Sequence, residues 1–415
     1  MSMALARHWD SDVTGQWKRD FPALASSADA PLHYLDNAAT TQKPAAVIDA
    51  MSRCLEAGQG PVHRGLYPLA ESASATYESA RERVARFIGA QQPEQLIFTG
   101  SATQAINMVA WGWLRPRLRP GDRVWVTRME HHANFLPWQR VCRETGAELW
   151  IIELNEDGSL DLAGADELLD GRTRMIALCQ VSNVLGVENP VRRVCGLAAS
   201  AGIPVLVDAA QSVAHMAVDV AALGCDFLAF SAHKMYGPSG IGALFGRPQR
   251  LEEMEPLLVG GGMVDQVSDD GAVWTPVPER FEAGSPNLAG AVGFAAAVDW
   301  LSAAGIGRVQ AQVADLAEQA VTALAGISQL RLLPSAETPR SSIVSFDVAG
   351  VHPHDVAQIA GARGVALRAG HHCCQPLMSH LGLGATVRAS FGVYNNRDDI
   401  EALIQAVHEA LRVFR

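Results

Sequence analysis

Short apolar runs alternate with amphipathic stretches over the middle of the chain, and this alternation constrains the fold more than any other feature. The stretches at 102–114 and 191–201 have helical spacing and separate runs of strand length. Such alternation is typical of a largely parallel sheet covered by helices on both faces, with functional residues at the strand ends and in the loops that follow. The sequence therefore predicts an α/β fold with a mostly parallel seven-stranded sheet, whose strands we place at 95–98, 123–127, 148–152, 174–179, 204–208, 226–230 and 241–245.

The length of 415 residues predicts two domains, at roughly 150 residues per domain. We expect a large domain over 20–292, from which the Gly-, Pro- and Asp-rich segment 259–286 departs as an excursion or hairpin. A smaller α+β domain is expected from residues 1–19 and 293–415, after a long connecting helix that starts near Ala289. Its expected elements are strands at 341–347, 365–368 and 386–391 and helices at 354–362 and 396–412, the last opened by a capping box of Asn396 and Asp399.

Composition excludes several classes of protein. The net charge of −11 argues against binding to a nucleic-acid backbone. The N-terminus has no apolar run of signal-peptide length, and the apolar stretch at 288–298 is too short to span a bilayer. The seven cysteines are odd in number and have neither disulfide nor zinc-finger spacing. We therefore expect a cytoplasmic protein with reduced thiols, no membrane contact and no bound metal.

Lysine is scarce, because only Lys18, Lys43 and Lys234 stand among 33 basic residues. Lys234 follows an apolar strand and precedes a glycine-rich turn, where desolvation would favour a neutral amine able to form a Schiff base. The alternative is a lysine on a surface loop. Asp208 ends another buried strand and would suit a cationic pyridine nitrogen, although a helix cap or a metal ligand fits equally.

Three further segments carry possible chemistry. Residues 98–104 form a Gly/Ser/Thr turn before a helix, which suits a phosphate but is by itself more typical of an ordinary capped helix. His131 is either a stacking or acid–base imidazole or a capping or core histidine. The segment 368–376 places Cys373 among histidines and near an arginine, which favours a thiolate. Zinc binding by the contiguous residues 371–374 would not readily close a tetrahedron.

Together these segments resemble one family along nearly the whole chain. The chain is similar to the class V aminotransferases of pyridoxal 5′-phosphate (PLP) fold type I, and more narrowly to the group II cysteine desulfurases of the Suf and Csd type, which include cysteine sulfinate desulfinases. Each motif is modest, but their number and order are specific. The matching motifs lie at 34–41, 62–65, 130–134, 182–186, 208–211, 231–234, 281–287, 368–373 and 388–390.

The resemblance implies a set of PLP-binding residues. Lys234 matches the Schiff-base lysine, Asp208 the partner of the pyridine nitrogen, and Gln211 the residue near the phenolic oxygen. Ala102 stands where relatives often carry a second threonine, so one phosphate contact is expected to be absent. The remaining implied contacts are His131 stacked on the ring, Asn183, and the phosphate binders Thr103, Ser231 and His233 together with Ser285 of the partner subunit.

The resemblance also implies the substrate site and the reaction. Cys373 matches the nucleophile that takes sulfur from L-cysteine as a persulfide, leaving L-alanine. The thiol of Cys374 stands where relatives carry a small residue, and we interpret it as a spectator rather than a disulfide partner of Cys373. The substrate-binding residues implied by the match are Arg388, Arg368, Asn183, Ala38, His63 and Arg64.

Further expectations follow from the same resemblance. The short segment between Arg368 and Cys373 implies dependence on a sulfur-acceptor protein of the SufE/CsdE type, which would serve iron–sulfur cluster or other sulfur-cofactor assembly. Ser285 and the 259–286 excursion imply an obligate homodimer. Cysteine sulfinate and selenocysteine are expected as additional substrates. Two alternatives stay open: another class V enzyme, such as an aminotransferase or epimerase that does not use Cys373, and a non-catalytic sulfur carrier or scaffold.

Overall fold

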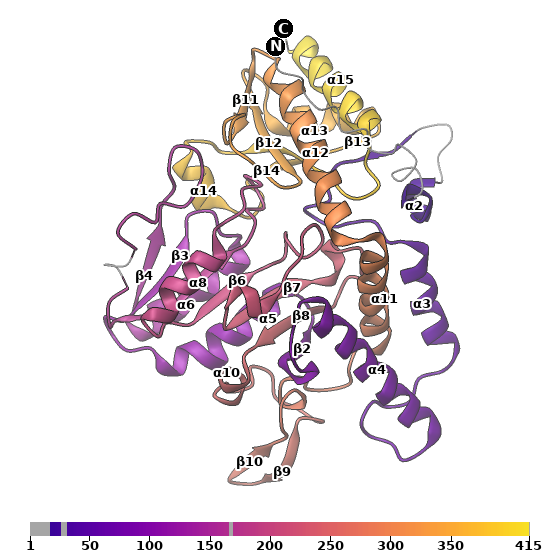
Figure 1. The fold of residues 1–415 in the computed structure, drawn as a ribbon, viewed down its shortest axis with the longest axis vertical. Helices are drawn as coiled ribbons and strands as arrows, with labels where there is room; N and C mark the ends of the chain where they lie inside the picture. Colours follow the sequence, from indigo (N-terminus) through magenta and orange to yellow (C-terminus); the bar gives the residue numbers. More distant parts are fainter. Residues whose placement is uncertain (1–16, 26–30, 166–168, 415) are drawn as a thin grey trace.

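A seven-stranded sheet forms the centre of the larger part of the molecule (Figure 1). The computed structural model describes residues 17–25, 31–165 and 169–414. The sheet order is β2-β8-β7-β6-β5-β3-β4, and only β8 runs antiparallel to its neighbours, so the predicted mostly parallel sheet is confirmed. The strands are β2 (Leu96–Thr99), β3 (Arg123–Thr127), β4 (Glu148–Ile152), β5 (Thr173–Cys179), β6 (Val205–Asp208), β7 (Phe227–Ser231) and β8 (Gly242–Gly246).

Both faces of this sheet are buried, which explains why its strands are continuous apolar runs. Along β6, Val205 and Val207 pack into one core cluster, whereas Leu206 between them packs into another. The first cluster is shared with α4 (Pro68–Phe87), α8 (Val191–Ser200) and α11 (Leu288–Ala304), and the second with α5 (Ala102–Met108) and α6 (Leu136–Thr145). The helix predicted at 102–114 is not uniform, because α5 passes into a π-helical turn, η2 (Val109–Leu114).

Shorter elements connect the strands and carry several site residues. The helix α3 (Ala45–Glu56) packs against α11 beside α4. The other short elements of the larger part are α2 (Pro22–Ala25), η1 (Pro93–Gln95), η3 (Arg115–Arg117), η4 (His132–Asn134), α9 (Val220–Leu223), η5 (Ala232–Lys234), α10 (Pro248–Glu252) and η6 (Glu279–Phe281).

The segment predicted as an excursion contains an antiparallel hairpin, β9 (Val264–Ser268) and β10 (Gly271–Trp274), which projects from the base of the molecule in Figure 1. The hairpin is exposed on nearly all of its residues. After it, α11 leads through Gly305 into α12 (Ile306–Ala325). Among the described residues no single helix is long and apolar enough to cross a membrane; only α11 and α12 taken together pass such a test, and they are bent by 79°.

The C-terminal part packs helices on a second, four-stranded sheet of order β11-β12-β15-β14. The prediction of one strand at 365–368 is wrong, because these residues divide between two strands with different partners: β13 pairs with β1 and β14 pairs with β15. The strand β11 was not predicted. The capping box of Asn396 and Asp399 is confirmed. The elements are β1 (His33–Tyr34), β11 (Leu330–Leu333), β12 (Ile343–Val348), α13 (Pro353–Ala362), β13 (Val365–Ala366), β14 (Arg368–Gly370), α14 (Gln375–His380), β15 (Thr386–Ser390) and α15 (Arg397–Val413).

The position of β1 is relevant to the site. Residues 33–36 pair with β13 and, through a bridge of Asp36 with Ser390, with the end of β15. The chain then crosses to the loop after β7, where Thr41 donates its N–H to the carbonyl of His233. The segment 36–43 therefore joins the two sheets. The assignment of residues 1–16 to a small domain lies outside the described residues.

Candidate functional site

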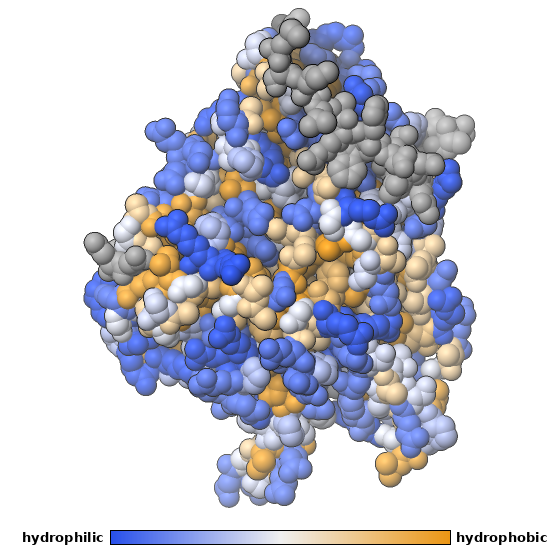
Figure 2. All heavy atoms as spheres, viewed as in Figure 1, coloured by the Kyte–Doolittle hydropathy of each residue, from blue (hydrophilic) through white to orange (hydrophobic). Residues whose placement is uncertain are grey.

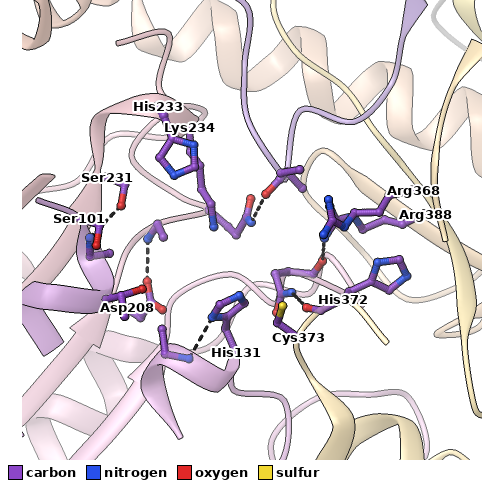
Figure 3. A pocket seen from close by; sticks show the side chains of 18 residues that line it. Ser101, His131, Asp208, Ser231, His233, Lys234, Arg368, His372, Cys373 and Arg388 are labelled. Carbon is purple, nitrogen blue, oxygen red and sulfur yellow. Dashed lines mark hydrogen bonds between the residues drawn. The ribbon is translucent and has the colours of Figure 1, made fainter. Parts of the chain in front are cut away.

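A pocket of about 250 Å³ opens where the large sheet meets β14 and β15. In Figure 3, Ser101, Ser231 and Asp208 lie on one side of it and Arg368, Arg388 and Cys373 on the other, with Lys234 and His131 between. The pocket brings together all but three of the predicted site residues. Those that line it are Ala38, Ala102, Thr103, His131, Asn183, Asp208, Gln211, Ser231, His233, Lys234, Arg368, Cys373 and Arg388.

The charges of Lys234 and Asp208 affect each other's pKa. Lys234 ends η5 directly after β7, and Asp208 is the last residue of the neighbouring β6. Burial lowers the pKa of the Lys234 amine, and the Asp208 carboxylate partly opposes this effect. Burial raises the pKa of Asp208, and Lys234 opposes the rise. Asp208 is 6 % exposed. The only hydrogen bond to its carboxylate among the described residues comes from the Ala210 N–H at 2.9 Å, so a carboxylate oxygen is left for a ligand.

The side of the pocket near β2 is rich in donors. Ser101 caps α5 by accepting the Gln104 N–H. The alternative prediction of an ordinary capped helix start at this turn is therefore confirmed. The Ser231 hydroxyl accepts the Ala102 N–H at 2.8 Å, and Thr103 is exposed at the pocket. Burial, with help from nearby lysines, lowers the pKa of His233 to about 4. Hydroxyl and amide donors at a helix start suit a phosphate group.

His131 both caps a helical turn and faces the pocket. Its Nδ1 accepts the Ala133 N–H at 3.0 Å, so the proton of the neutral ring lies on Nε2. Burial lowers the pKa of His131 to about 3, with Lys234 adding to the effect. The ring is therefore neutral near pH 7 and suited to stacking rather than to carrying charge.

Glu130 was not predicted as a site residue, although it lies in the same motif as His131. It is fully buried and accepts three hydrogen bonds, from the Thr127 hydroxyl at 2.6 Å, the Asn134 amide at 2.6 Å and the Cys179 N–H at 2.9 Å. These donors come from the ends of β3 and β5 and from η4. Burial nevertheless raises the pKa of Glu130 to about 7. The carboxyl group thus fixes the turn that presents His131.

Two arginines share one carboxylate on the opposite side of the pocket. Arg388 is 2 % exposed and donates from Nη1 to the Asn183 carbonyl at 2.8 Å and from Nη2 to Asp36 at 3.2 Å. Its Nε is buried and has no hydrogen-bond partner among the described residues. Arg368 pairs opposite Arg388 in the sheet and lies 3.8 Å from the other Asp36 oxygen. One positive charge remains uncompensated, which suits a substrate carboxylate. Sequence reasoning missed Asp36.

The Cys373 segment is held from several directions. His372 and Cys373 both have left-handed backbone, with φ of 51° and 55°, an uncommon conformation for residues other than glycine. The Asn183 amide donates to the His372 carbonyl at 2.7 Å, and the His132 N–H donates to the Cys373 carbonyl at 2.7 Å. The Cys373 N–H donates to Nδ1 of His371 at 3.1 Å. Such local strain persists only where the surroundings enforce it.

Cys374 differs from its neighbour. It is fully buried, its thiol donates to the Glu130 carbonyl at 3.2 Å, and burial raises its pKa to about 12. Both cysteines are free. A protonated thiol without exposure is neither a good nucleophile nor an accessible redox partner, which supports its interpretation as a spectator.

Three of the predicted site residues, His63, Arg64 and Ser285, lie outside the pocket. His63 pairs with Glu78 at 3.1 Å, the Arg64 guanidinium lies against Gly261 and Gly262, and Ser285 is exposed. The structure of one chain does not bring these residues into the pocket. Among the described residues, no group of three or more His, Cys, Asp or Glu side chains could hold a metal ion.

The donor set fits pyridoxal phosphate. An amine without a hydrogen bond in the described part of the chain, a buried carboxylate with a free oxygen, a neutral imidazole and a hydroxyl-rich helix start surround one pocket. These are the groups needed for the aldehyde, the ring nitrogen, the ring face and the phosphate.

Comparisons with known proteins agree with this chemistry. The model of the class-V aminotransferase family matches residues 33–403. A probable cysteine desulfurase of Halalkalibacterium halodurans is 43 % identical over 96 % of this chain and 98 % of its own, and a cysteine desulfurase of Pectobacterium atrosepticum is 44 % identical over 95 % and 98 %. The crystal structure of the cysteine desulfurase CsdA from Escherichia coli superposes with a TM-score of 0.90 at 41 % identity, covering 97 % of this chain and 99 % of that one.

Proposed function

We propose that this chain, which belongs to the class-V aminotransferase family, is a PLP-dependent cysteine desulfurase that converts L-cysteine to L-alanine and takes up the sulfur on Cys373. The observation that carries the proposal is the presence of the Cys373 thiol in the same pocket as Lys234, Asp208 and Arg388. A transaminase or epimerase has no need of a thiol at this position, whereas sulfur abstraction requires a nucleophile beside the substrate sulfur.

Each residue that would hold the cofactor has a separate role in the reaction. The bound cofactor supplies an electron sink for the bonds at the substrate Cα. Lys234 would hold it, and because burial lowers its pKa, its neutral amine is available to take up the Cα proton. Asp208 would hold the ring nitrogen and favour its protonated form, and the neutral imidazole of His131 would hold the ring face. Gln211 would lie on the side of the phenolic oxygen, and Thr103, Ser231 and His233 would hold the phosphate.

Arg388 orients the substrate and Cys373 performs the sulfur transfer. The substrate carboxylate binds Arg388, which is held by Asn183 and Asp36, with Arg368 nearby. The Cys373 thiolate attacks the cysteine sulfur, so an S–S bond forms while the substrate C–S bond breaks. The electron pair of that bond is protonated at carbon to give alanine, and the sulfur stays on Cys373 as a persulfide. Cysteine sulfinate and selenocysteine are further substrates in this proposal, because their leaving fragments depart more readily.

The held Cys373 segment supports a need for an acceptor protein. Hydrogen bonds from Asn183 and His132 and to His371 limit how far Cys373 can move. An acceptor of the SufE/CsdE type, which brings its own thiol to the persulfide, would then set the turnover rate. Adding such an acceptor to the purified enzyme should raise the rate of alanine formation, and a fast enzyme that no acceptor accelerates would contradict this part.

A homodimer is supported by an apolar surface around α3 and α4. Leu66 is fully exposed, and Figure 2 shows a hydrophobic tip where the loop between α3 and α4 projects. The exposed Val259 lies two residues before Gly261, against which Arg64 packs. Such a patch is typical of a protein interface. In the dimer, His63, Arg64 and Ser285 of the partner subunit would complete each site. The seven free thiols support a reducing, cytoplasmic location.

The test is a steady-state assay of alanine and sulfide production by the wild type and Cys373→Ala. Desulfuration of cysteine should collapse in the variant, whereas cleavage of selenocysteine should largely survive. A variant that still desulfurates cysteine at the wild-type rate would favour another class V activity. Cofactor binding, seen as a visible absorption band that disappears in Lys234→Ala, would exclude a non-catalytic scaffold.

A further inference from the structure

Lys43 occupies an unusual position for a basic residue of this chain. It lies at the end of the segment 36–43, partly buried, and its ammonium group donates to three oxygens: the His233 carbonyl at 3.1 Å, the Thr40 hydroxyl at 3.5 Å and the Thr41 carbonyl. No ion pair joins it to a carboxylate among the described residues. Among the described residues, the oxygens within hydrogen-bond distance of the ammonium are therefore neutral, and two of them, the Thr40 hydroxyl and the His233 carbonyl, lie 3.0 Å from each other.

The His233 carbonyl accepts four hydrogen bonds from the segment 36–43. It accepts the Thr41 N–H at 2.9 Å, the Thr40 hydroxyl at 3.0 Å, the Thr41 hydroxyl at 3.1 Å and the Lys43 ammonium at 3.1 Å. A carbonyl oxygen has two lone pairs, so these four donors share them and together limit the movement of the oxygen. This oxygen belongs to the peptide bond that joins His233 to Lys234.

The same segment also holds the chain beyond Lys234. The Thr41 hydroxyl accepts the N–H of Tyr236 at 2.7 Å, and Tyr236 has left-handed backbone with φ of 66°. The backbone from 233 to 236 is thus fixed on both sides of Lys234. In contrast, the Lys234 amine itself has no hydrogen bond to any described residue, so its position depends on the backbone that carries it.

We propose that Lys43 is a positioning residue that holds the His233–Lys234 peptide, and through it the Lys234 amine, at the cofactor. This inference rests on the proposed role of Lys234. A lysine suits the position because its compact ammonium fits among closely spaced oxygens, whereas the planar guanidinium of arginine presents its donors as a flat fork. This accounts for a lysine here in a chain that uses arginine at 30 of its 33 basic positions.

The charge of Lys43 is compatible with this role near neutral pH. Burial lowers its pKa to about 8, so the group remains an ammonium with three donors at pH 7. Its charge also contributes to the low pKa of His233, although burial and Lys234 contribute more.

The test compares Lys43→Met and Lys43→Arg with the wild-type holoenzyme and with Lys18→Met, a control at a lysine that is in no ion pair among the described residues. The readouts are kcat and KM for cysteine, the pH midpoint of the visible band of the lysine-bound cofactor, and the thermal midpoint. Both Lys43 variants should shift the pH midpoint of the band and lower kcat on the order of 10- to 100-fold, with little change in KM, because a misplaced reacting group slows the chemical step. Lys18→Met should match the wild type.

The inference is overturned if both Lys43 variants keep the wild-type kcat and pH midpoint, or if kcat falls only with the thermal midpoint while the pH midpoint stays unchanged. A parallel Lys234→Ala sample distinguishes failure of the proposed role of Lys234 from failure of the proposed role of Lys43. If that sample keeps the visible band, both the role of Lys234 and this inference fail. If it loses the band while the Lys43 variants match the wild type, this inference alone fails.

Discussion

Replacing Arg388 with lysine changes the shape of the substrate-binding group while keeping its charge. The guanidinium donates from Nη1 to the Asn183 carbonyl and from Nη2 to Asp36, and its buried Nε has no partner in the part of the chain that the structure describes. A substrate carboxylate would bind to this plane through two parallel hydrogen bonds. A lysine ammonium on a shorter side chain cannot keep both protein contacts and also form the pair of bonds.

The loss can be worked out from this geometry. One hydrogen bond to a charged group contributes about 1.5–3 kcal/mol. Because about 1.4 kcal/mol corresponds to tenfold, losing one of the two bonds lowers kcat/KM by about 10- to 150-fold. The carboxylate keeps its charge and place throughout the reaction, so most of the effect should appear in KM and little in kcat.

The assay is alanine formation over a range of cysteine concentrations, with Arg368→Lys as the matched control. Arg368 lies opposite Arg388 in the sheet, but its side chain is 46 % exposed and lies 3.8 Å from Asp36, so its replacement should change KM much less. The reasoning is refuted if Arg388→Lys leaves KM unchanged, or if Arg368→Lys raises KM as much as Arg388→Lys does.

Three other predictions follow from the site and its surroundings. Replacing the buried Cys374 with alanine should leave cysteine turnover within about twofold of the wild type, because its pKa near 12 keeps the thiol protonated; a collapse like that of Cys373→Ala would refute the spectator interpretation. Glu130 has a pKa raised to about 7, so the folded state binds more protons than the unfolded state between about pH 4.5 and 7, and stability from this group falls as pH rises. Denaturant titrations should therefore show the wild type losing stability over that range relative to Glu130→Gln, and parallel pH profiles would contradict the assignment. Leu66→Asp should shift the protein from dimer to monomer in light scattering and lower its activity, and a fully active dimer would argue against this interface.

The large sheet was predictable because its strands are buried on both faces and therefore appear as unbroken apolar runs. The edge strand β11 was not predictable, because Leu330 and Leu332 are only partly buried, Leu333 alone is fully buried, and the exposed Arg331 interrupts the apolar run. The division of 365–370 between β13 and β14 depends on which strand lies alongside, and the local sequence does not encode that choice.

The site was predictable to the extent that its residues end strands or fall in motifs. Lys234 and Asp208 follow apolar runs, and Cys373 stands in a conspicuous polar segment. Local sequence patterns could not predict contacts between segments that lie far apart in the chain. Lys43 meets the His233 carbonyl across 190 positions of the chain. Asp36 meets Arg388 across 352 positions. Neither residue has a spacing or composition that singles out its partner.

The central claim is that Cys373 receives the sulfur of cysteine. The most direct measurement is mass spectrometry of peptides from the holoenzyme after one turnover with L-cysteine, without reductant or acceptor. Our account predicts one added sulfur atom on the thiol of Cys373 and none on Cys374, together with about one alanine per active site. Alanine formed without added sulfur on Cys373 would contradict it.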